Sequence, residues 1–208
     1  MKHFILLLLV KAVMSSTTVQ AHLTPEQYLA LERKAITKSE YLNGHIYAMA
    51  GASREHNLIT VNISSGLHVQ LEDQPCEAYV NDMRLKISPT GLYTYPDVVV
   101  VCDEPHFEDT DLDTLLNPIV LVEVLSPSTE AYDRGEKFAH YRQLESLQEY
   151  ILVAQNRVRV EHYLRQGVQW LLTGLSDPDD VLHLTSIGCN LSLREIYAKV
   201  KFSASEER

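Results

Sequence analysis

Residues 95–102 read YPDVVVVC and residues 119–125 read IVLVEVL, and these two apolar runs decide the fold. Each run suits one buried strand, yet each carries a carboxylate: Asp97 lies near the start of the first run and Glu123 inside the second. An unpaired carboxylate in an apolar setting costs several kcal/mol or takes up a proton. Because a bound cation removes that cost, the pattern predicts that the two acids share a divalent metal. The alternative is that Asp97 is a turn residue after Pro96 and Glu123 an ion-pair partner.

Local patterns outside these runs predict a mixed fold. A stripe that recurs every four residues, from Ile59 to Leu71, predicts a buried helix capped by Ser53. Asn43-Gly44 predicts a hairpin turn within residues 40–49. We also expect helices at 24–34, 136–147 and 193–200, strands at 78–80, 83–87, 149–153, 157–164, 168–172 and 181–184, and a solvated acidic loop over 103–117. This order predicts an α+β fold, with a central mixed β-sheet flanked by helices and an additional hairpin region.

The length of 208 residues and the 45% hydrophobic content suit one domain, which we place at residues 23–198. Residues 1–22 are interpreted as a disordered extension, a misassigned start with Met14 as the true one, or a weak signal-like segment. The apolar run Phe4–Val10 is too short to span a bilayer, and Lys11 follows it. Residues 199–208 are expected to form a disordered tail.

Charge and cysteine content favour a cytoplasmic protein. The 18 basic and 28 acidic residues give a formal net charge of −10, which argues against broad, non-specific nucleic-acid binding but allows a small basic groove. Cys76, Cys102 and Cys189 are far apart, odd in number and not in a zinc-binding spacing. We therefore predict reduced cysteines in the core.

The residues after Glu123 add charged candidates. Ser126-Pro127 breaks the strand, and Arg134 and Lys137 lead into the next predicted helix. Lys137 is predicted to orient the attacking water or neutralise a phosphate, and Arg134 to contact a phosphate. The alternative is a solvated, charged helix start. Paired carboxylates suit Mg²⁺ or Mn²⁺, which lower the pKa of a bound water and stabilise charge on a phosphate.

Four segments closely resemble the Uma-two family, restriction-endonuclease-like proteins that are common in cyanobacteria and belong to the PD-(D/E)XK nuclease superfamily. They read SEYLNGHIYAMAGASREHNLI, YPDVVVVC, NPIVLVEVLSPSTEAYDRGEKFAHYR and SLQEYILV, and the resemblance covers residues 23–198. It implies a restriction-endonuclease-like core and a divalent-metal phosphodiesterase mechanism.

The resemblance also implies roles for particular residues. Pro96-Asp97 matches the PD element and Glu123 the acid of the (D/E)XK element, while the backbone carbonyl of Val124 is implied as a further metal ligand. The lysine of that element is missing, because Leu125 stands in its place. The resemblance implies that Lys137 substitutes for it.

The superfamily also tends to carry a glutamate on its first core helix. Glu55 is on that helix here, but Glu40 and His56 compete with it, and we favour Glu40 and His56 as additional catalytic residues. Asp82 is a further candidate acid, although Asn81-Asp82 equally suits a turn.

The resemblance implies a Mg²⁺- or Mn²⁺-dependent endonuclease that hydrolyses phosphodiester bonds in DNA as a homodimer. Apolar segments such as Val168–Leu172 could pair across the dimer interface. Two alternatives remain open: a non-catalytic DNA-binding or assembly module that keeps the fold, and a nuclease that acts on RNA or nucleotides. The missing lysine at position 125 and the net charge of −10 favour these alternatives.

Overall fold

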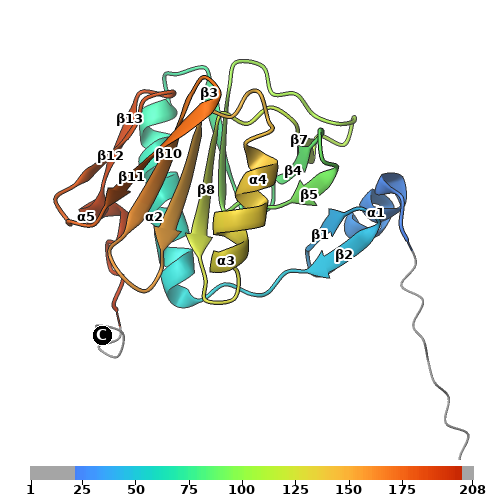
Figure 1. Cartoon of the computed structure of the whole chain (residues 1–208), viewed down its shortest axis with the longest axis horizontal. Helices are drawn as coiled ribbons and strands as arrows, with labels where there is room; N and C mark the ends of the chain where they lie inside the picture. The colour runs from blue at the N-terminus through green and yellow to red at the C-terminus, as the bar shows by residue number, and fades with distance from the viewer. Residues whose placement is uncertain (1–21, 203–208) are drawn as a thin grey trace, which may run out of the picture.

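The computed structural model describes residues 22–202, in which helices cover a six-stranded sheet that adjoins a five-stranded sheet and a two-stranded one (Figure 1). This arrangement confirms the predicted α+β fold. The expectations for residues 1–21 and for residues 203–208 lie outside the described part of the chain. Among the helices of residues 22–202, none is long and apolar enough to cross a membrane.

The six-stranded sheet is mixed. Its central strands β8 (Val120–Leu125) and β9 (Glu149–Ala154) are parallel, and every other neighbouring pair is antiparallel. β8 and β9 are buried along their whole length, which explains their near-continuous apolar sequences. The remaining strands continue the sheet on one side as β10 (Val160–Gln166) and β11 (Gln169–Leu175), and on the other as β6 (Val98–Cys102) and β3 (Cys76–Val80).

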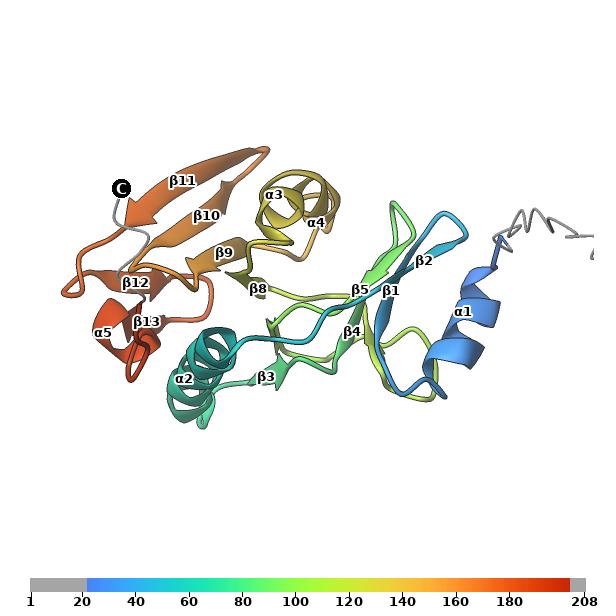
Figure 2. The same ribbon diagram turned by 90° about the horizontal axis from the view of Figure 1, so that it is seen from below.

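Helices cover both faces of this sheet, as Figure 2 shows. Helix α2 (Arg54–Leu71) packs its predicted stripe onto one face, and Ser53 caps its first turn. The other face carries α3 (Glu130–Tyr132), the π-helical turn η1 (Asp133–Lys137) and α4 (Phe138–Tyr141). The predicted bounds of 136–147 were wrong, because the helical segment begins at Glu130 and the buried Leu144 and Leu147 lie beyond its end.

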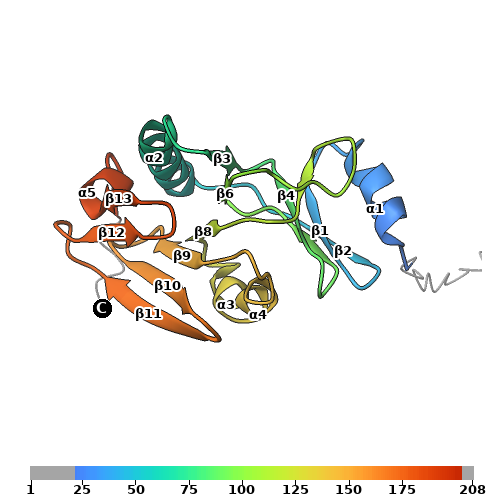
Figure 3. The same cartoon turned by 90° about the horizontal axis from the view of Figure 1, so that it is seen from above.

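The five-stranded sheet lies beside this core, with α1 (Pro25–Glu32) against it (Figure 3). Asn43 and Gly44 join β1 to β2 with φ angles of 49° and 86°, which confirms the predicted turn. The prediction of a loop over 103–117 was wrong at residues 114–115, which pair in parallel with β4 as the short strand β7. The strands are, in order across the sheet, β2 (His45–Ala48), β1 (Ser39–Leu42), β5 (Leu92–Thr94), β4 (Arg84–Ile87) and β7 (Thr114–Leu115).

The C-terminal part differs slightly from the prediction. β12 (Val181–Leu184) was expected, but its partner β13 (Cys189–Ser192) was not. Helix α5 (Leu193–Ile196) ends four residues before the predicted Val200. The Tyr197 ring is buried there, and its hydroxyl oxygen lies 3.0 Å from the Ala154 carbonyl oxygen.

The prediction of three reduced cysteines was wrong for two of them. Cys76 and Cys102 face each other on the neighbouring strands β3 and β6 and form a disulfide, whereas Cys189 is free and buried. Sequence spacing could not reveal this pairing, because it depends on strand register. The disulfide lies at the end of β6 that is farther from Asp97.

We expect reduction of this disulfide to lower the free energy of unfolding by about 3 kcal/mol, because the bond closes a loop between cysteines 26 residues apart. Urea unfolding with and without a thiol reductant measures the change. A Cys76→Ser/Cys102→Ser variant should match the reduced protein and be insensitive to the reductant. Equal stability of the oxidised and reduced proteins would contradict the assignment.

Candidate active site

The two predicted metal-binding acids lie at one end of the β6–β8 pair. Val98 faces Val122 in the antiparallel register, so one further step places Asp97 opposite Glu123. Side chains alternate between the faces of a sheet, so Glu123 and Asp97 belong to the face covered by α4. Directly opposite side chains in such a pair lie close together.

Asp97 has two polar contacts, both through one oxygen. The backbone N–H of Val124 donates to Asp97 Oδ2 at 2.7 Å, and His56 Nε2 lies 3.2 Å from the same oxygen. His56 comes from the first turn of α2, so this contact joins the helix on one face to the start of β6. Both side chains are about one-seventh exposed, at 15% for Asp97 and 14% for His56, so solvent reaches this part of the site.

Glu123 is almost completely buried, at 4% exposure. The Tyr141 hydroxyl donates to Glu123 Oε1 at 2.7 Å, and Lys137 Nζ lies 2.9 Å from the same oxygen. Burial raises the pKa of Glu123 to about 8, although the positive charge of Lys137 opposes the rise. The carboxyl therefore takes up a proton readily unless further positive charge is near.

Lys137 lies at the centre of three carboxylates. Besides Glu123, its Nζ is 3.4 Å from Glu40 Oε1 and 3.4 Å from Asp133 Oδ1. Burial alone would lower the pKa of Lys137, but these carboxylates raise it well above its ordinary value. The lysine is therefore a permanent buried cation.

Local structure explains how Lys137 reaches Glu123. Asp133 and Lys137 begin and end the π-helical turn, and both are buried against the sheet. Single π-helical turns are uncommon and occur often at functional sites. The turn places the ammonium beside Oε1 of Glu123, on the face that the helical segment covers.

Glu40 enters the site from the five-stranded sheet. It lies on β1, is 9% exposed and accepts a hydrogen bond from the Thr94 hydroxyl of the neighbouring β5. Its contact with Lys137 therefore joins the five-stranded sheet to the π-helical turn that covers the six-stranded sheet. The structure brings together Asp97, Glu123, Val124, Lys137, Glu40 and His56 through this chain of contacts.

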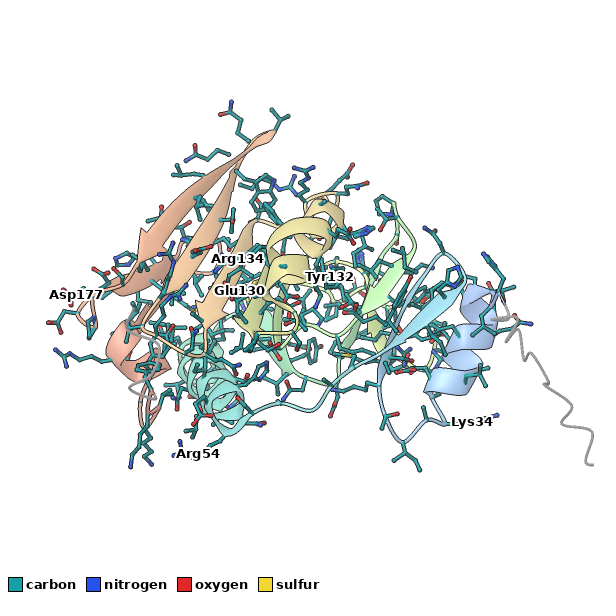
Figure 4. All side chains as sticks on the ribbon, turned by 60° about the horizontal axis from the view of Figure 1, so that its bottom comes forward. Lys34, Arg54, Glu130, Tyr132, Arg134 and Asp177 are labelled. Carbon is teal, nitrogen blue, oxygen red and sulfur yellow. A yellow bond between two sulfur atoms is a disulfide. The ribbon has the colours of Figure 1, made fainter. Side chains whose placement is uncertain are left out.

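Other predicted candidates lie outside this cluster. Arg134 forms ion pairs with Glu130 and with Glu161 of β10, so its guanidinium is directed along the surface of α3 and the sheet (Figure 4). Glu55 pairs with Arg54, and Asp82 pairs with Lys38 with its own side chain 88% exposed. Each of these three side chains therefore has an ion-pair partner outside the cluster.

Sequence reasoning missed two members of the cluster. Asp133 was not singled out although it precedes Lys137 by four residues, a spacing that places two side chains on one helix face. Tyr141 lies in the predicted helix 136–147 and was not singled out; its ring is buried, and its hydroxyl donates to Glu123. The spacing of Asp133, Lys137 and Tyr141 was the available signal.

The cluster has an excess of negative charge. With its carboxyls ionised, Glu40, Asp97, Glu123 and Asp133 face one lysine and a histidine. Their hydrogen bonds also leave room for a ligand, because the contacts of Asp97 go to Oδ2 and those of Glu123 go to Oε1. Within residues 22–202, no hydrogen bond reaches Asp97 Oδ1 or Glu123 Oε2.

The donor set fits a hard divalent cation. Within residues 22–202, no three His, Cys, Asp or Glu side chains form a ready-made metal cage. Mg²⁺ does not need one, since it commonly binds one or two carboxylates and keeps several waters. In a β-strand, the N–H and C=O groups of one residue point toward the same neighbouring strand. The Val124 N–H donates to Asp97, so the Val124 carbonyl also points toward Asp97.

The raised pKa of Glu123 predicts a pH-dependent stability of the metal-free protein. The carboxyl has a pKa of about 8 in the folded protein against an ordinary value of 4.5, so its contribution to stability is fully present below pH 4.5 and is lost as pH rises through 8. We expect the free energy of unfolding to fall by at least about 1.4 kcal/mol across this window, the value of one pKa unit.

Urea unfolding of the wild type and Glu123→Gln at several pH values measures this effect. The variant should lack most of the decline, whereas Asp82→Asn, which changes an exposed carboxylate, should keep it. The same decline in Glu123→Gln as in the wild type would contradict the assignment to Glu123.

Comparison with known proteins gives a consistent result. Residues 25–194 match the family model Uma2, described as "Putative restriction endonuclease". The chain is 45% identical over 154 residues to the "Uncharacterized protein sll1609" of Synechocystis, covering 74% of this chain and 87% of that protein. It is 40% identical over 181 residues to "Uncharacterized protein slr1290" of the same organism, covering 86% and 94%.

The fold also matches a solved structure. A crystal structure of a "putative nuclease belonging to DUF820" from Anabaena variabilis superimposes with a TM-score of 0.70 at 19% sequence identity. The match covers 84% of this chain and 97% of that chain. The restriction-endonuclease-like fold expected from the sequence is thereby confirmed.

Proposed function

The chain belongs to the Uma2 family, and on that premise we propose that it is a Mg²⁺- or Mn²⁺-dependent endonuclease that hydrolyses phosphodiester bonds in DNA. The observation that carries this proposal is the buried cluster in which Asp97, Glu123 and Lys137 meet at one end of β6 and β8. An arrangement of three carboxylates around one buried lysine is costly for stability alone, because buried charges need compensation.

Asp97 Oδ1, Glu123 Oε2 and the Val124 carbonyl would hold the metal. A divalent cation at such a site lowers the pKa of a bound water and stabilises the charge that develops on a phosphate. Its positive charge would also favour the ionised form of Glu123, whose pKa burial raises to about 8. Metal affinity should therefore rise with pH, because binding displaces a proton from this carboxyl.

Lys137 and Tyr141 fix the position of Glu123 by contacting the same oxygen, Oε1, and so direct Oε2 away from them. Lys137 has three N–H donors, and Glu40, Glu123 and Asp133 surround it. The contacts to Glu40 and Asp133 are the longer ones, at 3.4 Å each. We propose that Lys137 gives up one of them to donate a hydrogen bond to the attacking water or to a phosphate oxygen.

His56 and the Val124 N–H fix Asp97 in the same manner, through Oδ2. As a partly exposed imidazole at the rim of the cluster, His56 is placed to hold or deliver a proton during the reaction. Glu40 acts through Lys137, because its contacts run to the ammonium and to Thr94.

Cleavage assays on supercoiled plasmid, single-stranded DNA and RNA, each with Mg²⁺, Mn²⁺ or a chelator, test this proposal. We expect metal-dependent nicking of the plasmid. Cleavage of RNA alone would favour the alternative of a ribonuclease. Nucleic-acid binding without cleavage of any substrate would favour a non-catalytic binding module, which the enclosure of Lys137 Nζ by three carboxylates also supports.

We further propose a cytoplasmic homodimer. The cytoplasm is suggested by the acidic composition alone, since two of the three cysteines form a disulfide. The dimer is suggested by the outer strand β11, next to which Val168 is 98% exposed. Leu171 and Leu172 on β11 are about half exposed, at 48% and 51%. Sedimentation of a monomer at micromolar concentration would contradict the dimer without affecting the proposed chemistry.

A further inference from the structure

The two ends of the central strands differ in the charged side chains that they expose around them. Beyond Cys102, at the end of β6 farther from Asp97, the chain enters a loop of six acids: Asp103, Glu104, Glu108, Asp109, Asp111 and Asp113. The end that holds the candidate active site carries exposed cations instead. We define the basic edge as Arg54, Arg157, Arg159 and Lys199, which come from three separate parts of the chain.

The register of the sheet places the basic edge next to the active site. Leu125, which follows Val124, pairs with Ala154 at the end of β9. The turn that contains Arg157 and Arg159 begins directly after Ala154. It therefore projects from the same end of the sheet as Asp97 and Glu123.

Side-chain contacts fix the three parts of the basic edge to each other. The Ser53 hydroxyl, at the start of α2, donates to Gln155 Oε1 at 2.7 Å and so holds Arg54 near the turn. On the other side, the Tyr197 hydroxyl oxygen lies 2.7 Å from the Arg159 carbonyl. Lys199 follows Tyr197 by two residues and is exposed. Figure 1 shows the start of α2, this turn and the end of α5 at the lower left of the molecule.

The charges of the basic edge are available to a ligand. Arg157 and Lys199 form no ion pair with any other residue of the described part of the chain, 22–202. Arg54 pairs only with the adjacent Glu55, at 3.3 Å, and Arg159 contacts Glu161 through Nε, with its side chain 47% exposed. The Arg54–Glu55 pair is exposed and contributes at most about 1 kcal/mol, so a phosphate can replace it. The Arg159 contact uses only Nε, so the two terminal guanidinium nitrogens of Arg159 have no ion pair within residues 22–202.

We propose that the basic edge binds the phosphodiester backbone of the nucleic-acid strand that enters the candidate active site; this inference rests on the proposed function. A chain with a net charge of −10 repels nucleic acid at long range, so binding requires a local positive surface. The N-terminus of α2, from which Arg54 extends, adds partial positive charge at the same place.

Fluorescence anisotropy of the full chain with a labelled DNA duplex, in chelator and over a salt series, tests the proposal. We expect Arg157→Gln and Lys199→Gln each to weaken binding severalfold. Each lost contact to a duplex should make the slope of log affinity against log salt concentration shallower by about 0.9. Over a fourfold rise in salt, the affinity of each variant should therefore fall by a factor about 3.5-fold smaller than that of the wild type. A labelled single strand, with a smaller slope of about 0.7 per contact, shows which form the edge prefers.

Lys34→Gln is the matched control, because Lys34 is an exposed lysine beyond α1, well apart from Arg54 (Figure 4). It removes the same charge and should leave binding unchanged. Equal losses in Lys34→Gln and Arg157→Gln, unchanged binding in both basic-edge variants, or no binding of either probe by the wild type would overturn the inference.

Cleavage separates this inference from the proposed function. If the wild type binds through the basic edge but cleaves nothing, the proposed hydrolysis is wrong and the inference stands. If it cleaves with metal while the basic-edge variants bind and cleave like the wild type, the inference is wrong and the proposed function stands.

Discussion

Replacement of Asp97 by Asn, or of Glu123 by Gln, is expected to reduce metal-dependent cleavage by at least about 10³-fold. Each change removes one of the two carboxylates that would hold the cation, and a bound metal contributes several kcal/mol to stabilisation of the transition state. The two effects should not add, since loss of either ligand removes the same metal. Initial rates of plasmid nicking in Mg²⁺ and Mn²⁺ measure the loss.

Asp82→Asn is the control for this experiment, because it changes a carboxylate that is 88% exposed and paired with Lys38. It should nick at the wild-type rate. Urea unfolding shows that the variants remain folded, and Glu123→Gln should be at least as stable as the wild type at pH 8. Cleavage by folded Asp97→Asn or Glu123→Gln at the wild-type rate would rule out the metal site.

Replacement of Lys137 by Met is expected to lower the free energy of unfolding by about 3–5 kcal/mol at neutral pH. The change leaves Glu40, Glu123 and Asp133 without their shared buried cation, and removal of one partner from a buried ion pair costs this much. The loss should shrink in acid, where the carboxyls are protonated. Cleavage should fall as well, because the proposed donor to water or phosphate is missing.

Two variants separate the structural role of Lys137 from its chemical role. Lys137→Arg keeps the charge but changes the donor geometry, so it should recover part of the stability without recovering cleavage. Lys86→Met removes a partly exposed lysine that contacts Glu108 and should cost much less stability. Normal cleavage by Lys137→Met would show that the lysine does not substitute for the one missing at position 125.

The sequence predicted those parts of the fold that depend on local patterns. The hydroxyl of Ser53, the stripe from Ile59 to Leu71 and the pair Asn43-Gly44 each specify their element through nearby residues, and the structure confirms all three. Pairing between segments far apart in the chain could not be predicted in the same way. The disulfide between Cys76 and Cys102 depends on the β3–β6 register, which no short pattern encodes.

In the candidate site too, local patterns could be predicted from the sequence, whereas contacts between distant segments could not. A carboxylate inside an apolar strand identified Glu123, and its pairing with Asp97 followed from the order of the strands. The contact of Glu40 with Lys137 requires the packing of one sheet against the other, which sequence spacing does not provide. The ion pair of Arg134 with Glu161 was equally out of reach of the sequence, because Glu161 lies on β10, far along the chain.

The most direct test of the central claim is anomalous diffraction from a crystal soaked in Mn²⁺. The account predicts one strong anomalous peak bridging Asp97 and Glu123, with the Val124 carbonyl as a further ligand and Lys137 still beside Glu123. A fully soaked crystal with no peak between these two carboxylates, or with its only peak at the acidic loop of residues 103–113, would contradict it.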